Sequence, residues 1–213
     1  MDIKIFNLII LDESGSMSSI KQQAINGFNE TVQTIVSATI KHPEQTHFVS
    51  LVTFNGNGIK TVYDRKEAKT VCELDDKTYS PNCNTPLYDA MGSALTNLVK
   101  NVETEDKVLV TIITDGEENA SVEYSGKAIK ALVEELRAKG WVFAYIGANQ
   151  DVEKVAATIS ITNKISFDAS SHGARAMYEK LDSCYSIFFD RVADKESDFD
   201  LQYNFFAEDK TDD

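Results

Sequence analysis

The amino-acid sequence predicts an α/β fold, with helices on both faces of a doubly wound, mostly parallel sheet. Near-continuous apolar runs, typical of strands buried on both faces, begin at Ile3, Lys107 and Trp141. Segments with helical spacing of apolar residues separate these runs, and such alternation favours a parallel sheet between helical layers. Gly56-Asn57-Gly58 joins two further strand-like runs as a hairpin, so we expect one antiparallel strand at the edge of the sheet.

The first elements follow from apolar patterning and from residues that favour helix ends. Residues 3–11 form the first apolar run and predict a strand. Ser19 and Gln22 have the spacing of a capping box, so a helix should start there and stop before Pro43. Its apolar stripe comprises Ile20, Ala24, Phe28, Val32, Ile35 and Thr39.

The two strands of the hairpin are expected at 46–56 and 58–65, and residues 66–84 should be mostly irregular. Thr85-Pro86 opens a helix that runs to about Val102, because proline is favoured at the first helical position. The remaining elements are expected as a strand at 107–116, a helix at 124–140 closed by Gly140, a strand at 141–149, a short helix at 151–160, a short strand at 163–167 and a last helix at 170–192.

The length fits one domain. A chain of 213 residues with 42% hydrophobic residues can bury a substantial core. We expect this domain to span residues 1–192 and to be followed by an acidic tail at 193–213. Aromatic residues in the tail would dock it on the domain: Phe199, Tyr203, Phe205 and Phe206.

Charge and cysteine content exclude several classes of partner and site. The 34 acidic and 21 basic side chains give a net charge of -13, and no cluster of Lys and Arg offsets it. We therefore expect neither nucleic acid nor a membrane as partner. The odd number of cysteines and the absence of C-x-x-C spacing argue against a zinc site and a secreted disulfide framework. With no apolar run of about 18 residues and no signal peptide, we expect a cytoplasmic protein.

Two of the buried strands end on a carboxylate, LIILD at Asp12 and TIITD at Asp115. If these strands are neighbours, the two carboxylates meet at the carboxyl edge of the sheet, where such folds bind ligands. They would repel each other unless a cation lay between them or one were protonated. In DESGS, Asp12, Ser14 and Ser16 can all turn their oxygens inward around Gly15.

A divalent cation is the ligand that these oxygens favour. Carboxylates and hydroxyls without nitrogen or sulfur suit Mg²⁺, Mn²⁺ or Ca²⁺ rather than zinc, and Mg²⁺ is the expected ion. Thr85, just before a helix, is the expected ligand from a third loop. Taken singly, Ser14 and Ser16 fit turn or cap positions, Thr85 fits a helix N-cap, and Asp115 fits a turn. Only the set favours a metal site, and we expect Glu13, Glu117 and Glu118 to be solvated loop charges.

Three motifs resemble one known family. DESGSM resembles the D-x-S-x-S motif of von Willebrand factor type A (vWA) domains, TPLYDAM resembles their threonine loop, and TDGEEN resembles their second aspartate loop. Their order matches the metal-ion-dependent adhesion site (MIDAS) of this Rossmann-like family, over residues 1 to about 192 and as in stand-alone bacterial members. The resemblance implies that Ser14, Ser16 and Thr85 bind the metal directly, and that Asp12 and Asp115 bind it directly or through water. The glycine pair often found before the threonine is Cys83-Asn84 here.

We therefore predict a metal-dependent protein-binding module without enzymatic activity, whose cation captures an Asp or Glu of a protein partner. A haloacid-dehalogenase-like phosphatase is one alternative, but it needs a second aspartate as general acid where this chain has Ser14. A structural module whose metal only holds three loops together is another. Carboxylates of the acidic tail are a further candidate ligand, through self-association or within one molecule.

Overall fold

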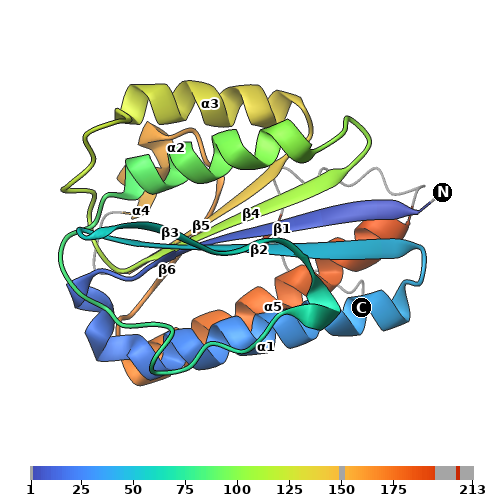
Figure 1. The fold of residues 1–213 in the computed structure, drawn as a ribbon, viewed down its shortest axis with the longest axis horizontal. Coiled ribbons are helices and arrows are strands. Elements are labelled where there is room, and N and C mark those ends of the chain that lie inside the picture. The colour runs from blue at the N-terminus through green and yellow to red at the C-terminus, as the bar shows by residue number, and fades with distance from the viewer. Residues whose placement is uncertain (1, 149–151, 195–204, 207–213) are drawn as a thin grey trace, which may run out of the picture.

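The computed structural model describes residues 2–148, 152–194 and 205–206, over which six strands form one sheet between two layers of helices (Figure 1). The strands are β1 (Ile3–Asp12), β2 (Gln45–Asn55), β3 (Gly58–Glu67), β4 (Lys107–Thr114), β5 (Val142–Ala148) and β6 (Asn163–Phe167). Their order in the sheet is β3-β2-β1-β4-β5-β6. Only the β2–β3 pair is antiparallel among these described strands, so the predicted fold class is confirmed.

The helices cover both faces of the sheet. On one face lie α1 (Lys21–Lys41) and α5 (Ser171–Ala193), and on the other lie α2 (Leu87–Leu98), α3 (Gly126–Ala138) and α4 (Val152–Thr158) (Figure 1). Short 3-10 turns follow β1, β3 and α2, as η1 (Gly15–Ile20), η2 (Ala68–Thr70) and η3 (Val99–Asn101). None of the helices in the described ranges is long and apolar enough to cross a membrane.

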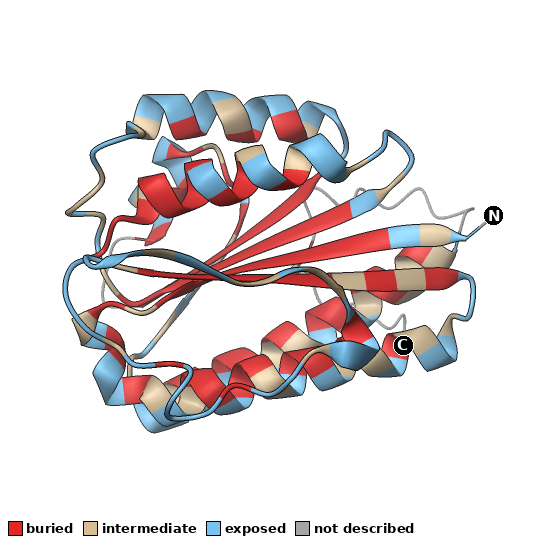
Figure 2. Ribbon diagram, in the orientation of Figure 1, coloured by how far each residue is buried: buried red, intermediate tan, exposed pale blue. Residues whose placement is uncertain are grey.

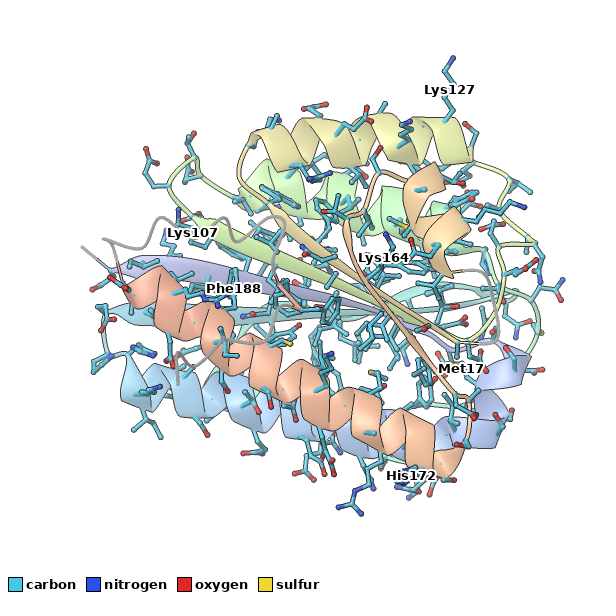
Figure 3. All side chains as sticks on the ribbon, turned by 180° about the vertical axis from the view of Figure 1, so that it is seen from behind. Met17, Lys107, Lys127, Lys164, His172 and Phe188 are labelled. Atoms are coloured by element: carbon cyan, nitrogen blue, oxygen red, sulfur yellow. The ribbon has the colours of Figure 1, made fainter. Side chains whose placement is uncertain are left out.

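The apolar runs became central strands because both of their faces are buried, as Figure 2 shows for β1, β4 and β5. In β1, Ile5 and Ile9 pack on the side of α1 and α5, whereas Leu8 and Ile10 pack on the side of α2 and α3. Burial of each such side chain contributes roughly 1.5–3 kcal/mol to folding. From behind, Figure 3 shows Phe188 on α5, where its ring packs in the same core as Ile5.

The hairpin brings a turn to the carboxyl edge of the sheet. Asn55 pairs with Gly58 across the turn, and the φ of Gly58 is 147°, in the region that favours glycine. Asp12 pairs with Phe54, so the hairpin tip lies beside the end of β1. The predicted hairpin and its antiparallel edge strand are confirmed.

Two of the predicted helix starts need correction. The capping box of Ser19 and Gln22 is wrong: Ser19 lies in η1, its hydroxyl donates to the Ser16 carbonyl over 3.2 Å, and α1 begins at Lys21. The chain first makes a 3-10 turn, and this turn places Met17 in the core, where it is fully buried. Pro86 is the N-cap residue of α2 rather than its first helical residue.

Of the acidic tail expected at 193–213, the structure describes Ala193, which ends α5, and Asp194, Phe205 and Phe206. Phe205 is buried, its ring packs edge-on against Tyr185 and Phe188, and its N–H donates to Oδ1 of Asn163 over 3.0 Å. Phe199, Tyr203 and the tail carboxylates offered above as internal ligands lie outside the described residues.

Candidate metal centre

The ends of two neighbouring strands bring the two predicted aspartates together. β1 ends at Asp12, β4 ends one residue before Asp115, and the two strands pair in parallel up to Leu11 and Ile113. Both carboxylates therefore reach the same edge of the sheet. Asp12 is fully buried and Asp115 is 3% exposed, so each ionised carboxylate needs compensation from its surroundings.

The loop after β1 turns its polar groups toward these carboxylates. The Ser14 N–H donates to Oδ1 of Asp12 over 2.7 Å, and the hydroxyl of Thr114 donates to Oδ2 over 2.6 Å. The hydroxyls of Ser14 and Ser16 lie 3.2 Å apart, and Ser16 donates to Oδ1 of Asp115 over 2.6 Å. Ser14 and Ser16 thus lie beside the two aspartates and contact them through hydrogen bonds.

Gly116 marks the point where the three loops meet. A Cβ built on it would lie 3.1 Å from the Thr85 hydroxyl oxygen, 3.4 Å from that of Ser16 and 3.9 Å from Oδ2 of Asp12. A side chain at this position would crowd the oxygens, so glycine keeps the space between them open. The structure therefore brings all five predicted residues into one site.

Thr85 is held in place by a residue that sequence reasoning missed. Its N–H donates to Oδ1 of Asn119 over 2.9 Å, and the Asn119 N–H donates to the Thr85 carbonyl over 3.2 Å. The interpretation of Thr85 as a helix cap is wrong, because Pro86 is the N-cap residue of α2 and the Thr85 hydroxyl accepts no backbone N–H of this helix. Thr85 is buried as a residue, and its hydroxyl makes no hydrogen bond within the described part of the chain, so this oxygen is available to a metal ion.

The electrostatics of the site favour a cation. Burial raises the pKa of Asp12 to about 6, although hydrogen bonds from Thr114 and Ser14 lower it, and the Asp115 charge raises it further. Burial also raises the pKa of Asp115, against the hydrogen bond from Ser16. Oδ2 of Asp115 is buried and has no hydrogen-bond partner among the described residues. A cation beside this oxygen would supply the missing interaction and would relieve the repulsion between the carboxylates.

The donor set is rich in hydroxyls rather than in charges. No group of three or more His, Cys, Asp or Glu residues that could hold a metal occurs within the described ranges. The candidate site instead combines the two aspartates with three neutral hydroxyls, those of Ser14, Ser16 and Thr85. Such an all-oxygen set fits Mg²⁺, Mn²⁺ or Ca²⁺ by the chemistry of its donors.

Two of the three nearby glutamates accept hydrogen bonds from loop backbones. The prediction that they are solvated charges is therefore wrong for Glu13 and Glu118. Oε1 of Glu13 accepts from the Ser80 N–H over 2.6 Å. Glu118 accepts three backbone N–H groups, one of them from Tyr88 at the start of α2 over 2.9 Å. Glu117 is exposed, as predicted. The carboxylates of Glu13 and Glu118 therefore stabilise the loops around the site.

Asp89 was also missed by sequence reasoning. It lies in the first turn of α2, is 6% exposed, and accepts the backbone N–H groups of Val122, Glu123 and Tyr124 over 2.8–2.9 Å. An acidic residue shortly after the threonine loop was the only signal in the sequence. Asp89 ties the loop between β4 and α3 to the helix that follows Thr85.

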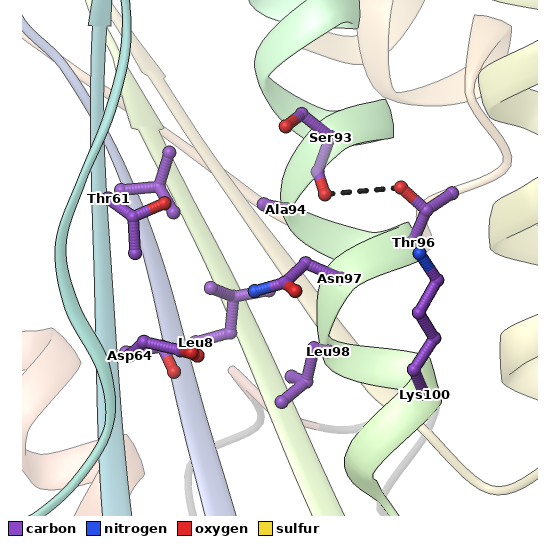
Figure 4. Close-up of a pocket in the computed structure, with 11 residues that line it drawn as sticks. Leu8, Thr61, Asp64, Ser93, Ala94, Thr96, Asn97, Leu98 and Lys100 are labelled. Atoms are coloured by element: carbon purple, nitrogen blue, oxygen red, sulfur yellow. Dashed lines mark hydrogen bonds between the residues drawn. The ribbon is translucent and has the colours of Figure 1, made fainter.

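A separate pocket of about 390 Å³ lies between the hairpin strands and α2 (Figure 4). Its rim is polar, with Thr61 and Asp64 on β3 and with Ser93 and Lys100 on the opposite side. Asp64 is already paired with Arg65 over 2.7 Å. None of the five candidate ligands lines this pocket, so it is not part of the candidate metal centre.

Comparisons with known proteins agree with this geometry. The family model of the von Willebrand factor type A domain matches residues 8–180, which include all five candidate ligands. A search of the curated proteins finds no match.

Several solved structures share the fold. Proximal thread matrix protein 1 from the mussel byssus is 16% identical, with a TM-score of 0.57, over 86% of this chain and 46% of its own. The vWF domain of the pilus tip protein Mfa5 from Porphyromonas gingivalis is 8% identical, with a TM-score of 0.62, over 88% and 96%. Manganese-loaded TRAP from Plasmodium vivax is 14% identical, with a TM-score of 0.52, over 83% and 72%. The chain thus spans less than half the length of the mussel protein, and at these identities the likeness concerns the fold alone.

Proposed function

The chain belongs to the von Willebrand factor type A domain family, and from this premise we propose that it is a metal-dependent protein-binding module. Domains of this family are commonly protein-interaction modules. In the proposed function, Asp12, Ser14, Ser16, Thr85 and Asp115 hold a divalent cation, with Mg²⁺ as the expected ion. The partner is a protein that presents an Asp or Glu side chain to this site.

One observation carries the proposal. Oδ2 of Asp115 is buried and unpartnered within the described structure, although the other polar groups around it are hydrogen-bonded or converge on Gly116. Buried polar atoms without partners are rare in folded proteins and often mark a missing ion or ligand. TRAP from Plasmodium vivax, which shares the fold, is manganese-loaded in its crystal structure, and this supports a divalent ion here.

The donor set also explains how a partner would be recognised. A bound divalent cation would supply Lewis acidity toward one more oxygen ligand. Because Ser14, Ser16 and Thr85 are neutral ligands, they would leave much of this Lewis acidity available to the additional ligand. A carboxylate is the partner group best suited to bind such a cation, because hard divalent cations prefer oxygen ligands. Recognition of this kind is short-range, so the net charge of -13 does not prevent binding of an acidic group.

The two alternatives have less support. A phosphatase of the haloacid dehalogenase type needs a proton donor two positions after Asp12, and Ser14 stands there with its N–H bonded to that carboxylate. We therefore propose that the protein binds its partner without enzymatic activity. A structural module whose metal only holds the loops together would use the same five residues, and the two functions differ only in partner binding.

A titration of acetate, as a simple carboxylate, distinguishes the partner-binding function from the structural alternative. We expect acetate to shift the NMR signals of the loop residues when the protein is saturated with Mg²⁺ and not when a chelator is present. Thr85→Val, which keeps the shape of the side chain but removes the hydroxyl, should weaken the Mg²⁺ affinity. Identical acetate titrations with and without Mg²⁺ would contradict the binding function and would favour the structural alternative.

A cytoplasmic setting in a bacterium is also part of the proposal. It is supported by Cys72, Cys83 and Cys184, none of which forms a disulfide within the described residues. Self-association through the acidic tail is a further part, and it concerns residues that the structure does not describe.

A further inference from the structure

Five asparagines lie at the carboxyl edge of the sheet around the candidate metal centre. Asn55 and Asn57 are at the tip of the β2–β3 hairpin, Asn82 and Asn84 precede Thr85, and Asn119 follows β4. We name this set the amide collar. Asn55 is half-buried and the other four are exposed.

Contacts between the loops make the amide collar one continuous surface. The N–H of Gly15 donates to the Cys83 carbonyl over 2.9 Å, so residues 82–84 lie beside the serine loop. A Cβ built on Gly56 would lie 3.0 Å from the Asn84 nitrogen, so the hairpin tip lies directly against the same segment. Asn119 is bonded to Thr85 on the remaining side.

Hydrogen bonds fix the orientation of three of these amides. Oδ1 of Asn55 accepts from the Asn57 N–H over 2.9 Å, Oδ1 of Asn82 from the Cys83 N–H over 2.8 Å, and Oδ1 of Asn119 from the Thr85 N–H over 2.9 Å. Because a backbone N–H can only donate, each amide oxygen must face the N–H that it accepts, and the Nδ2 group is left as the other, donating end of the amide. Within the described structure these Nδ2 groups have no acceptor.

The other two members add donors of the same kind. Oδ1 of Asn57 accepts from the Cys83 thiol over 3.5 Å, which again leaves Nδ2 free. The Asn84 side chain has no hydrogen-bond partner in the part of the chain that the structure describes. The carboxylates of Glu13, Glu118 and Asp89 are meanwhile occupied by backbone N–H groups of the same loops. The surface around the metal centre therefore offers uncharged N–H donors, in a protein that is acidic as a whole.

We propose that the amide collar binds the main chain of the partner on either side of its Asp or Glu residue. Carbonyl oxygens of an extended peptide are neutral acceptors that recur along the chain, and they match neutral donors spread around a central metal site. The inference rests on the proposed function, because the acidic side chain is what brings the peptide to this surface. It adds that the partner segment is extended and that its backbone contributes to affinity.

Asparagine-to-aspartate variants isolate the Nδ2 donors. Asn82→Asp and Asn119→Asp keep the accepting oxygen that braces each loop and replace only the Nδ2 group. Asn84→Ala removes a side chain without internal hydrogen bonds, so it should leave the fold intact. Asn101→Asp in η3 adds the same charge at the opposite end of α2 and serves as the control.

The probes are acetate and the peptide acetyl-Gly-Gly-Asp-Gly-Gly-amide, titrated by NMR into protein saturated with Mg²⁺ in 0.5 M NaCl. Salt at this level screens the added charge, so that the loss of a donor dominates. We expect the peptide to bind about tenfold more tightly than acetate, as two or three hydrogen bonds would allow. That advantage should vanish in the Asn82→Asp/Asn119→Asp double variant, shrink in Asn84→Ala and persist in Asn101→Asp.

Two results would overturn the inference in different ways. Equal binding of peptide and acetate to the intact protein, or an unchanged advantage in the variants, would remove the amide collar while leaving metal-dependent carboxylate binding in place. Absence of Mg²⁺-dependent binding of either probe to the intact protein would remove the proposed function, and the amide collar with it.

Discussion

The Ser16 hydroxyl donates to Oδ1 of Asp115 over 2.6 Å, although the two residues are 99 positions apart in the sequence. The bond ties the loop after β1 to the loop after β4, at the point where these parallel neighbours end. It satisfies one oxygen of Asp115, while the other stays buried without a partner among the described residues. The fold therefore positions both Ser16 and Asp115, but it leaves one carboxylate oxygen of Asp115 without a hydrogen bond.

Replacement of Ser16 by alanine should weaken Mg²⁺ binding. The change removes one candidate ligand and the hydrogen bond that orients Asp115, so we expect a loss of about tenfold in affinity, equal to about 1.4 kcal/mol. Ser18→Ala is the matched control, since Ser18 is also exposed and makes no hydrogen bond within the described structure. Calorimetric titration measures both; equal affinities for the two variants would exclude Ser16 as a ligand.

Asp12→Asn should stabilise the protein in the presence of a chelator. The two buried carboxylates repel each other there, and an amide at position 12 removes one charge while its oxygen can still accept from Ser14 or Thr114. We expect the variant to melt a few degrees higher than the intact protein without metal. Addition of Mg²⁺ should raise the melting temperature of the intact protein only, and a lower melting temperature of the variant in chelator would argue against repulsion at the site.

Acid should destabilise the fold through His47. Its side chain is buried against Phe189, and burial lowers its pKa to about 4, with a smaller effect of His42. The unfolded chain binds a proton at its ordinary pKa of about 6.5, so the stabilisation is complete above that pH and is lost as the pH falls toward 4. The total loss is about 3 kcal/mol. Urea titrations of the intact protein and of His47→Gln between pH 4 and 7 measure it; parallel pH profiles would contradict the expectation.

Asp89→Ala should destabilise the protein by about 2 kcal/mol, because three backbone N–H groups in the loop between β4 and α3 lose their acceptor. Asp89→Asn retains one acceptor oxygen, so its free energy of unfolding should lie between those of the intact protein and Asp89→Ala. Urea denaturation gives the difference directly. A change below about 0.5 kcal/mol, the range of ordinary surface substitutions, would show that solvent replaces Asp89.

Phe205→Ala should cost about 3 kcal/mol, as expected when a buried phenylalanine is removed. Its ring packs against Tyr185 and Phe188 of α5, whereas the neighbouring Phe206 is half-buried. Phe206→Ala is therefore the control and should cost less. Similar losses of unfolding free energy in both variants would show that the Phe205 contacts do not hold this segment to the domain.

The strands and the meeting of the aspartates were predictable because they depend on regular features. A run buried on both faces identifies a parallel strand, and the ends of parallel neighbours must share one edge, which brought Asp12 and Asp115 together. The roles of Asp89, Glu118 and Asn119 were not predictable from the sequence. Each accepts N–H groups from a loop whose path depends on the tertiary structure, and such irregular segments have no periodicity from which contacts can be read.

The central claim is that the five oxygen-bearing residues hold a divalent cation. The most direct measurement is a calorimetric titration of Mg²⁺, with Mn²⁺ and Ca²⁺ in parallel, into chelator-treated protein and into Asp12→Ala. We expect saturable binding to the intact protein and none to the variant. Equal binding to both proteins would place the metal elsewhere, and no binding of any of the three ions to the intact protein would contradict the claim.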